Sequence, residues 1–332
     1  CTNKTYYKKP TYPNFYFKKY YKMQAVPFWI TLDFEAFNVP YTDNNTQNNT
    51  RKIYHQEGNS FAYCVVQASH YNTKFYNKVD EEVYKCELAE PVRLYRGDNM
   101  SKILFEMLEK DVQLIINKMQ KYKTYETNDL IEYYREITTH CDICNKKILN
   151  HDEKVVDHCH VTGKVRRICH NTCNIKLRFD KKDKIVIPII VHNLKNYDSH
   201  IIFSSLEKKF KIKIIAQSEE KYISFGLNNM RFIDSYQFVS KSLAELIAEQ
   251  KNKNNNIEYL KSKFPLTASH FDNELLDLVT EKGVYLYEYV NSYEQFDLPL
   301  PPKSEFDRNT LNLNQPISDE KYKFAQTVYE TF

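Results

Sequence analysis

The sequence predicts a mixed α/β fold with a small metal-binding module inserted in one of its loops. Apolar runs typical of strands alternate along the chain with stretches of helical spacing, which favours a mixed fold. Five of the eight cysteines fall between Cys141 and Cys173, in a segment that shows no long helical pattern. A composition of 42% hydrophobic and 14% aromatic residues supplies the side chains for a core, which excludes a disordered chain.

The first part of the predicted domain, residues 27–137, follows an irregular lead-in over residues 1–26. Its strands are apolar runs bounded by polar loops or glycine, and its helix repeats apolar side chains every three or four residues. Asp98 or Ser101 can cap that helix. The predicted strands are Pro27–Phe34, Ser60–Ala68 and Val83–Tyr95, and the predicted helix is Asn99–Tyr122.

The second part of the domain, residues 181–256, resumes after an insertion at residues 138–180. Residues 257–332 show little periodicity, and we expect an extended, loop-rich linker there. The predicted strands of the second part are Lys184–His192, Lys211–Gln217, Tyr222–Phe225 and Met230–Phe238, and its predicted helices are about Ser199–Phe210 and Ser242–Lys251.

Composition and charge exclude several classes of function. No Gly-x-Gly or Gly-Lys-Ser/Thr sequence occurs, which excludes a glycine-rich phosphate loop. The N-terminal segment lacks the apolar core of a signal peptide, and the longest apolar run, Ile185–Val191, is too short to span a bilayer. We therefore expect no membrane partner. The net charge of +4 says little, but basic residues outnumber acidic ones by about two to one between Cys141 and Lys184, which indicates a phosphate-bearing partner.

Carboxylates follow two of the predicted buried strands. Asp33 and Glu35 end the first strand, and residues two apart in a strand point to the same side. Asp198 follows the strand of the second part and begins a helix, where a negative charge is favoured. Converging carboxylates repel one another unless a cation lies between them, and their oxygens suit Mg²⁺ or Mn²⁺. The alternative is an ordinary acidic strand end that faces solvent.

The same residues resemble two motifs of family B DNA polymerases, Exo I as Asp33-x-Glu35 and Exo II as Asn193-x3-Tyr197-Asp198. The surrounding stretches PFWITLDFEAF, IPIIVHNLKNYDSHIIF, MRFIDSYQFVSKSLAEL and KGVYLYEYVNSYEQFDLPLPP are similar to the protein-primed polymerases of Maverick/Polinton-like elements and their viral relatives. The resemblance covers nearly the whole chain from about Pro27. It implies a ribonuclease-H-like 3′–5′ proofreading exonuclease domain of a DNA polymerase.

This resemblance also implies residue roles and partners. The partners would be a single-stranded DNA 3′ end, a primer–template and a terminal priming protein. The Ser-Leu pair that would contact the single strand is also explained by an ordinary helix start. By the resemblance, the catalytic, Mg²⁺- or Mn²⁺-binding residues are Asp33, Glu35 and Asp198, and the substrate-binding residues are Asn193, Tyr197, Ser242 and Leu243.

The sequence departs from the family pattern in two respects. The third exonuclease motif, Tyr-x3-Asp, is matched in its letters by Tyr293-x3-Asp297, but this pair lies in a stretch that precedes the true motif in the family. The palm motifs of the polymerase are not found, and the chain begins with Cys1 rather than Met. We therefore expect a fragment of a longer polymerase whose exonuclease site lacks one ligand.

A second constellation lies in the insertion. Cys141-x2-Cys144 and His170-x2-Cys173 stand about 25 residues apart, and three Cys with one His make a complete tetrahedral Zn²⁺ set. Clustered cysteines without a secretory signal favour metal binding over disulfides. Cys169 could replace His170 as the fourth ligand, although the x2 spacing favours His170.

The residues between and after these pairs resemble recombination endonuclease VII and the wider HNH nucleases of the treble-clef, or ββα-metal, type. Asp157-His158-x-His160, Thr162-Gly163-x2-Arg166 and Cys173-Asn174 stand in the family's order. By this resemblance Asp157 and Asn174 would bind Mg²⁺, His158 would be the general base supported by His160, and Lys164, Arg166 and Arg167 would contact phosphate.

Three hypotheses follow from these constellations. The first is the exonuclease region of a family B polymerase. The second is an HNH endonuclease in which the flanking strands are a scaffold. The third is a zinc-dependent DNA-binding remnant of a mobile element that no longer cuts. The cellular location would follow the DNA, in the nucleus or at a viral replication site of a eukaryotic host.

Overall fold

The chain folds into two compact units. The described residues of 121–184, with those of 69–81, form the first unit, and those of 28–68, 82–120 and 185–332 form the second. The computed structural model describes residues 26–41, 54–68, 72–76, 92–121, 123–150, 153–177, 185–196, 198–204, 212–218, 221–254, 256–307 and 315–332.

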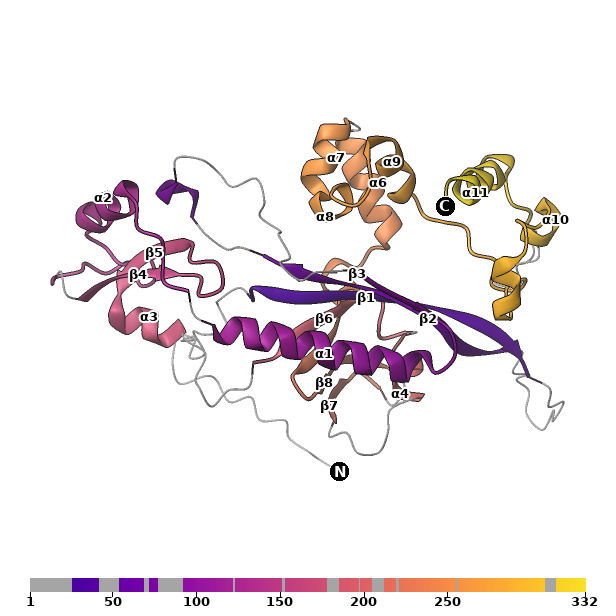
Figure 1. The fold of residues 1–332 in the computed structure, drawn as a ribbon, viewed down its shortest axis with the longest axis horizontal. Helices are drawn as coiled ribbons and strands as arrows, with labels where there is room; N and C mark the ends of the chain where they lie inside the picture. The colour runs from indigo at the N-terminus through magenta and orange to yellow at the C-terminus, as the bar shows by residue number, and fades with distance from the viewer. Residues whose placement is uncertain are drawn as a thin grey trace, which may run out of the picture. The chain divides into compact units, whose positions relative to one another are not determined.

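A seven-stranded sheet forms the centre of the second unit (Figure 1). Its strand order is β3-β2-β1-β6-β9-β8-β7, with β1, β6 and β9 parallel and the outer strands antiparallel. Carboxyl ends of the three parallel strands therefore meet at one edge of the sheet. The strands are β1 (Phe28–Pro40), β2 (Tyr54–Gln67), β3 (Val92–Arg96), β6 (Ile187–Val191), β7 (Ile212–Ala216), β8 (Tyr222–Leu227) and β9 (Met230–Asp234).

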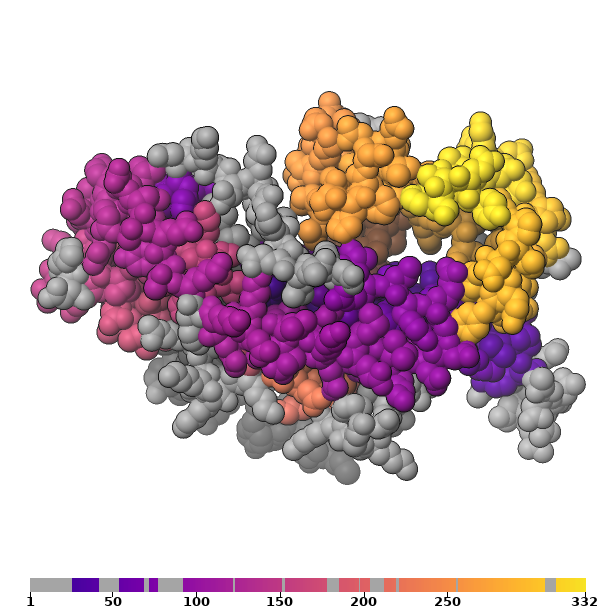
Figure 2. Space-filling view, viewed as in Figure 1, coloured from indigo at the N-terminus to yellow at the C-terminus, as the bar shows by residue number. Residues whose placement is uncertain are grey.

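The central strands are apolar because they are buried. Ile30 of β1 and both Ile189 and Val191 of β6 are fully buried, as expected for parallel strands in the middle of a sheet. The long helix α1 (Met100–Gln120) packs on this sheet, and its Phe105 ring meets the ring of Phe232 on β9 at 6.4 Å. In Figure 2 the outer side of α1 forms a continuous exposed surface.

Gly58 of β2 allows two helices to approach the sheet closely. A Cβ at this position would lie 2.2 Å from Met100 Cε and 2.7 Å from Ile201 Cγ2. Met100 begins α1, and Ile201 belongs to α4 (Asp198–Ser204). Because real Cβ atoms do not come so close to other heavy atoms, a larger residue here would force the Met100 and Ile201 side chains to move. The close packing also positions α4, which carries Asp198, one of the predicted metal ligands.

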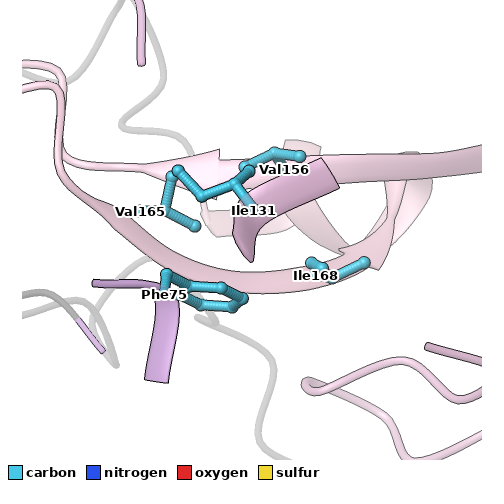
Figure 3. Close-up of a cluster of buried hydrophobic side chains, with 5 residues drawn as sticks. All are labelled: Phe75, Ile131, Val156, Val165 and Ile168. Atoms are coloured by element: carbon cyan, nitrogen blue, oxygen red, sulfur yellow. The ribbon is translucent and has the colours of Figure 1, made fainter. Parts of the chain in front are cut away.

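The first unit is a β-hairpin with helices around it. The strands of the hairpin share a hydrophobic cluster with a helix and a short 3₁₀ turn that lie far away in sequence (Figure 3). The cluster consists of Phe75, Ile131, Val156, Val165 and Ile168. The elements are η2 (Thr73–Phe75), α2 (Asp129–Ile137), β4 (Lys154–His158), β5 (Val165–His170) and α3 (Asn171–Leu177).

Short helices follow the sheet, contrary to the extended segment predicted for residues 257–332. Four of them begin at side-chain caps, which Ser242, Asn256, Asp272 and Ser318 supply. Because most are too short to show a clear apolar period, the sequence pattern revealed only the helix predicted at Ser242–Lys251. They are α5 (Tyr236–Val239), α6 (Leu243–Lys253), α7 (Ile257–Lys263), α8 (Pro265–Ala268), α9 (Asn273–Val279), η4 (Tyr293–Asp297), α10 (Lys303–Phe306) and α11 (Asp319–Thr331).

The mixed α/β class is confirmed, and the differences concern element ends. Strand β9 stops at Asp234 instead of Phe238, because the chain turns there into the short helix α5. The Asp234 carboxylate accepts the N–H of Tyr236, the first residue of α5, at 2.9 Å. Helix α2 was not predicted. Most of the predicted strand at 83–95 and the end of the predicted helix at 199–210 lie outside the described residues. Over the described part of the chain, no helix has the length and apolar character to cross a membrane.

Candidate metal centres

The four predicted zinc ligands come together in the first unit. Cys141 and Cys144 lie in a tight turn, in which the Asn145 N–H donates to the Cys141 carbonyl at 2.8 Å. His170 ends β5, and Cys173 lies in the first turn of α3. Their ligand atoms all lie within 4.8 Å of one another. Three sulfurs and one imidazole nitrogen at this spacing fit tetrahedral Zn²⁺.

The imidazole of His170 is oriented for binding through one nitrogen. Its Nδ1 lies 3.5 Å from Cys144 Sγ and 3.9 Å from Cys173 Sγ. Its Nε2 lies 3.3 Å from the Lys147 carbonyl oxygen, an acceptor that selects the tautomer with the proton on Nε2. The ligand nitrogen is therefore the one that faces the sulfurs. Cys169, the alternative ligand, is fully buried among apolar side chains and lies outside the group.

The sulfur ligands differ in acidity. Burial opposes ionisation of Cys141, but N–H groups of His170, Cys144 and Ile143 outweigh it and lower the pKa of this thiol to about 7. Burial, and then the neighbouring thiols, raise the pKa of Cys173 to about 11. Ionising the Cys173 thiol beside the other thiols is therefore unfavourable without a cation. A bound Zn²⁺ supplies that cation, which is why the donor set suits this ion.

The residues of the HNH-like motif lie on the hairpin beside this group. Gly163 has a φ of +78°, and a Cβ there would lie 2.9 Å from the Thr124 carbonyl oxygen, so the turn requires glycine. Asp157 is 3% exposed and makes ion pairs with Arg166 and Arg167 at 2.7 and 2.9 Å. Asn174 lies on α3, half-buried. Arg166, predicted to contact phosphate, is thus engaged within the protein.

A carboxylate group lies at the strand ends of the second unit. Asp33 and Glu35 are on β1, which pairs in parallel with β6, and Asp198 begins α4 shortly after β6. Burial and then the charges of Asp33, Glu35 and Asp234 raise the pKa of Asp198 to about 8. Burial and then Asp33 raise the pKa of Glu35 to about 7. The structure thus brings the three predicted carboxylates within electrostatic reach of one another.

Asp33 is more solvent-accessible than its two partners. Surrounding protein atoms still displace enough water to raise its pKa. The Phe34 backbone N–H and the nearby His192 lower this pKa, but by less than burial raises it. His192 is itself held by Ser235, whose Oγ lies 2.9 Å from its Nδ1. Mutually repelling carboxyl oxygens are the donor set for a hard divalent cation. Among the described residues, the group whose ligand atoms gather for a metal ion is the Cys/His one, and these carboxylates are not part of such a group.

Asp234 is a buried residue beside the carboxylate group that the sequence did not single out. It is fully buried at the end of β9, and its carboxylate accepts N–H groups of Asn193 at 3.0 Å and Lys195 at 3.2 Å. It thereby fixes the loop between β6 and α4, where Asn193 takes the left-handed φ of +65°. Its position after an apolar strand, like that of Asp33, was the available signal. Tyr197 of this loop lies outside the described residues.

Tyrosines from a distant segment also reach the carboxylates, and sequence reasoning missed them too. Tyr287 Oη lies 3.5 Å from Glu35 Oε2, and Tyr285 Oη accepts from Asn59 Nδ2 at 3.4 Å. Burial and the Glu35 charge raise the pKa of Tyr287 to about 12. Tyr293 of the Tyr-x3-Asp match instead packs its ring edge-on against Phe37 at 5.0 Å. The alternating tyrosines of the sequence VYLYEY were the available signal.

The predicted Ser-Leu pair lies at the start of a helix. Ser242 caps α6, because its Oγ accepts the Glu245 N–H at 3.2 Å while Glu245 Oε2 accepts the Ser242 N–H at 2.7 Å. Leu243 is 51% exposed. Ser242 therefore has a local structural role, and the exposed Leu243 is free to contact a ligand.

Comparison with known proteins identifies one segment. Residues 117–187 match the family of recombination endonuclease VII. No curated protein and no solved structure matches the chain. The matched segment contains the Cys/His group and the hairpin, so the chain carries an endonuclease VII-like module with a group that can hold zinc.

Proposed function

We propose that this chain binds DNA through a zinc-stabilised module of the endonuclease VII type. One observation carries the proposal. The segment that matches the endonuclease VII family, residues 117–187, contains all four residues whose sulfur and nitrogen atoms gather within 4.8 Å. Small modules with so few buried side chains depend on such a metal for their fold. The family's substrate indicates DNA as the partner.

The charges of the module support a phosphate partner. Lys146 and Lys147 are exposed in the turn that follows the Cys141–Cys144 pair, and the Arg167 side chain is 31% exposed. Basic side chains that neutralise phosphates make binding strongly dependent on salt concentration. We therefore assign the DNA contact to these exposed cations.

Zinc analysis and DNA binding on the full chain test this proposal. We expect one zinc per chain, and a DNA dissociation constant that rises steeply with salt in a fluorescence anisotropy titration. Cys173→Ser should lose the zinc and weaken DNA binding at least tenfold. Cys64→Ser is the matched control, because Cys64 lies in the second unit outside the Cys/His group. Equal DNA affinity of the zinc-free Cys173→Ser variant and the wild type would contradict the proposal.

A second candidate function concerns the carboxylates of the second unit. We infer that Asp33, Glu35 and Asp198 bind Mg²⁺ or Mn²⁺ and hydrolyse the 3′ end of single-stranded DNA, as the resemblance to a ribonuclease-H-like exonuclease domain implies. The pKa values of Asp198 and Glu35, raised by burial and then by neighbouring carboxylates, favour it, because a bound cation would stabilise the ionised carboxylates. A divalent metal there would supply an activated water and charge neutralisation. Polymerase activity and a terminal priming protein remain predictions from the resemblance alone.

A nuclease assay on 3′-labelled single-stranded DNA tests the second candidate. The full chain, or a longer natural chain that contains it, should release 3′ nucleotides in Mg²⁺ or Mn²⁺, and Asp33→Ala with Glu35→Ala should lower the rate at least a hundredfold. A matched control is Asp129→Ala, an exposed acidic residue of α2. Degradation that persists in the double variant would show that these carboxylates are not the site.

A further inference from the structure

Asp157 of the zinc module has both carboxylate oxygens facing arginines. Arg166 Nη2 donates to Oδ1 at 2.7 Å, and Arg167 Nε lies 2.9 Å from Oδ2. The Asp157 side chain is 4% exposed and that of Arg166 is 11% exposed. A buried charge with this little access to water needs its partners, so these contacts are part of the folded module.

Arg166 also bridges the two strands of the hairpin where their backbone pairing is interrupted. In the ladder of β4 and β5, Asp157 pairs with Arg167 and His158 pairs with Val165, so Arg166 is the extra residue of a β-bulge. A bulge interrupts the ladder hydrogen bonds at that point. Arg166 Nη2 donates to the His158 carbonyl oxygen at 2.6 Å, besides its bond to Asp157. One guanidinium therefore ties both strands together across the bulge.

His158 is similarly engaged by backbone groups. Its Nδ1 lies 3.3 Å from the Val156 carbonyl oxygen, and its Nε2 lies 3.2 Å from the Lys123 carbonyl oxygen. A general base needs one ring nitrogen whose lone pair faces a water molecule. Here both nitrogens face oxygens that only accept hydrogen bonds. The ring also packs against Tyr125 and His160 at 5.4 and 4.9 Å.

These contacts do not fit the divalent cation that the HNH resemblance implies at Asp157. Such a cation takes carboxylate oxygens that face no positive charge as ligands. Asp157 Oδ1 accepts a hydrogen bond from Arg166, and Oδ2, which accepts no hydrogen bond, lies 2.9 Å from the Arg167 Nε in an ion pair. Taking Asp157 away from the arginines would leave the Arg166 guanidinium buried without its counter-charge. The ligand atoms of the Cys/His group, in contrast, all lie within 4.8 Å of one another.

We propose that Asp157, Arg166 and Arg167 form a structural ion-pair lock across the hairpin bulge, and that the module binds DNA without cutting it. The DNA part of this inference rests on the proposed function. The lock itself is a property of the module alone. Phosphate contacts then come from the exposed cations Lys146, Lys147 and the open side of Arg167, while Arg166 serves the fold.

Cleavage of a closed DNA circle tests the absence of cutting. A supercoiled plasmid has no 3′ end, so the carboxylate group of the second unit cannot contribute by removing terminal nucleotides. The zinc-loaded full chain should retard the plasmid in a gel and leave it unnicked in Mg²⁺ or Mn²⁺. Nicking that is lost in His158→Ala, with the zinc content unchanged, would overturn the inference. Failure to retard any DNA would instead contradict the proposed function.

Zinc retention tests the lock without reference to DNA. We expect Asp157→Asn and Arg166→Gln each to accelerate the release of zinc to a chromogenic chelator at least tenfold, and the double variant to release it no faster than either single variant. Glu132→Gln, which removes an exposed carboxylate of α2 in the same unit, should leave the rate unchanged. Unchanged zinc release in both single variants would show that the ion pairs do not hold the module together.

A thermal scan separates a lock from a metal ligand. If Asp157 were a cation ligand, its carboxylate would be an unpaired negative charge without that cation. Asp157→Asn would then remove an unfavourable charge and would not lower the temperature of zinc release. The lock predicts a decrease of several degrees for Asp157→Asn, and a recovery when Asp157→Leu is combined with Arg166→Met, because apolar residues can replace a buried ion pair. No recovery in that pair, together with an unshifted Asp157→Asn, would overturn the lock.

Discussion

Two buried aspartates in the second unit differ because their surroundings differ. Asp234 ends β9, and N–H groups of Asn193, Lys195 and Tyr236 donate to its carboxylate, so it shapes the loop after β6. Asp198 begins α4, and burial together with the charges of Asp33 and Glu35 raises its pKa to about 8. Position therefore makes one aspartate structural and leaves the other suited to a cation.

This raised pKa predicts a pH-dependent stability for the second unit. Below the ordinary pKa of aspartate, near 4, Asp198 is protonated in both the folded and the unfolded state, and the free energy of unfolding is highest. As pH rises towards about 8 the folded state holds more protons than the unfolded state, so stability falls. We expect a loss of roughly 1.4 kcal/mol per pH unit for one such carboxyl.

Urea unfolding followed by the fluorescence of Trp29 measures this effect, because the only tryptophan lies on β1. Asp198→Asn should flatten the pH profile between pH 5 and 8, and added Mg²⁺ should do the same for the wild type by favouring the ionised carboxylates. Asp272→Asn, the exposed cap of α9, serves as the control. Parallel profiles for Asp198→Asn and the wild type would show that ionisation of Asp198 does not cause the pH dependence of the free energy of unfolding.

At the scale of elements, a buried charge fixes α1 on the sheet. Asp111 of α1 is 1% exposed and accepts from Tyr63 Oη of β2 at 2.7 Å and from Arg93 Nε of β3 at 3.2 Å. Burial and the Asp111 contact raise the pKa of Tyr63, which keeps this phenol protonated as a donor. One carboxylate thus sets the position of the helix against two strands.

Removal of the arginine should therefore destabilise the second unit strongly. Arg93→Met leaves the Asp111 carboxylate buried with its hydroxyl partner alone, and we expect a loss of about 3–5 kcal/mol in the free energy of unfolding. Tyr63→Phe should cost about 1.5–3 kcal/mol, the value of a hydrogen bond to a charged group.

Denaturant titration on the Trp29 signal measures both losses. Gln113→Ala, on the exposed side of α1, is the matched control and should change stability by less than about 0.5 kcal/mol. An Arg93→Met variant as stable as the control would mean that Asp111 is not buried as a charge.

At the scale of the molecule, the two units divide the chain differently from the predicted insertion at 138–180. The first unit includes the described residues of 121–184, and the family match at 117–187 coincides with that range. The first unit also includes residues of 69–81, because Phe75 packs into the apolar cluster of the hairpin. Long-range packing of this kind leaves no periodic signal in the sequence, so residues as distant as 69–81 cannot be assigned to this unit from spacing alone.

The sequence by itself determined the positions of β1, β2 and β6 to β9, the long helix α1, and the Cys and His residues that can hold zinc. Each of these depends on spacing between near neighbours: alternation in a strand, three- to four-residue repeats in a helix, and pairs of ligands two residues apart. Only the tertiary structure decided that Asp157 is held by Arg166 and Arg167, and that Tyr287 reaches Glu35 across 252 positions of sequence. Those contacts depend on the hairpin bulge and on how distant segments pack, and neither is encoded in local spacing.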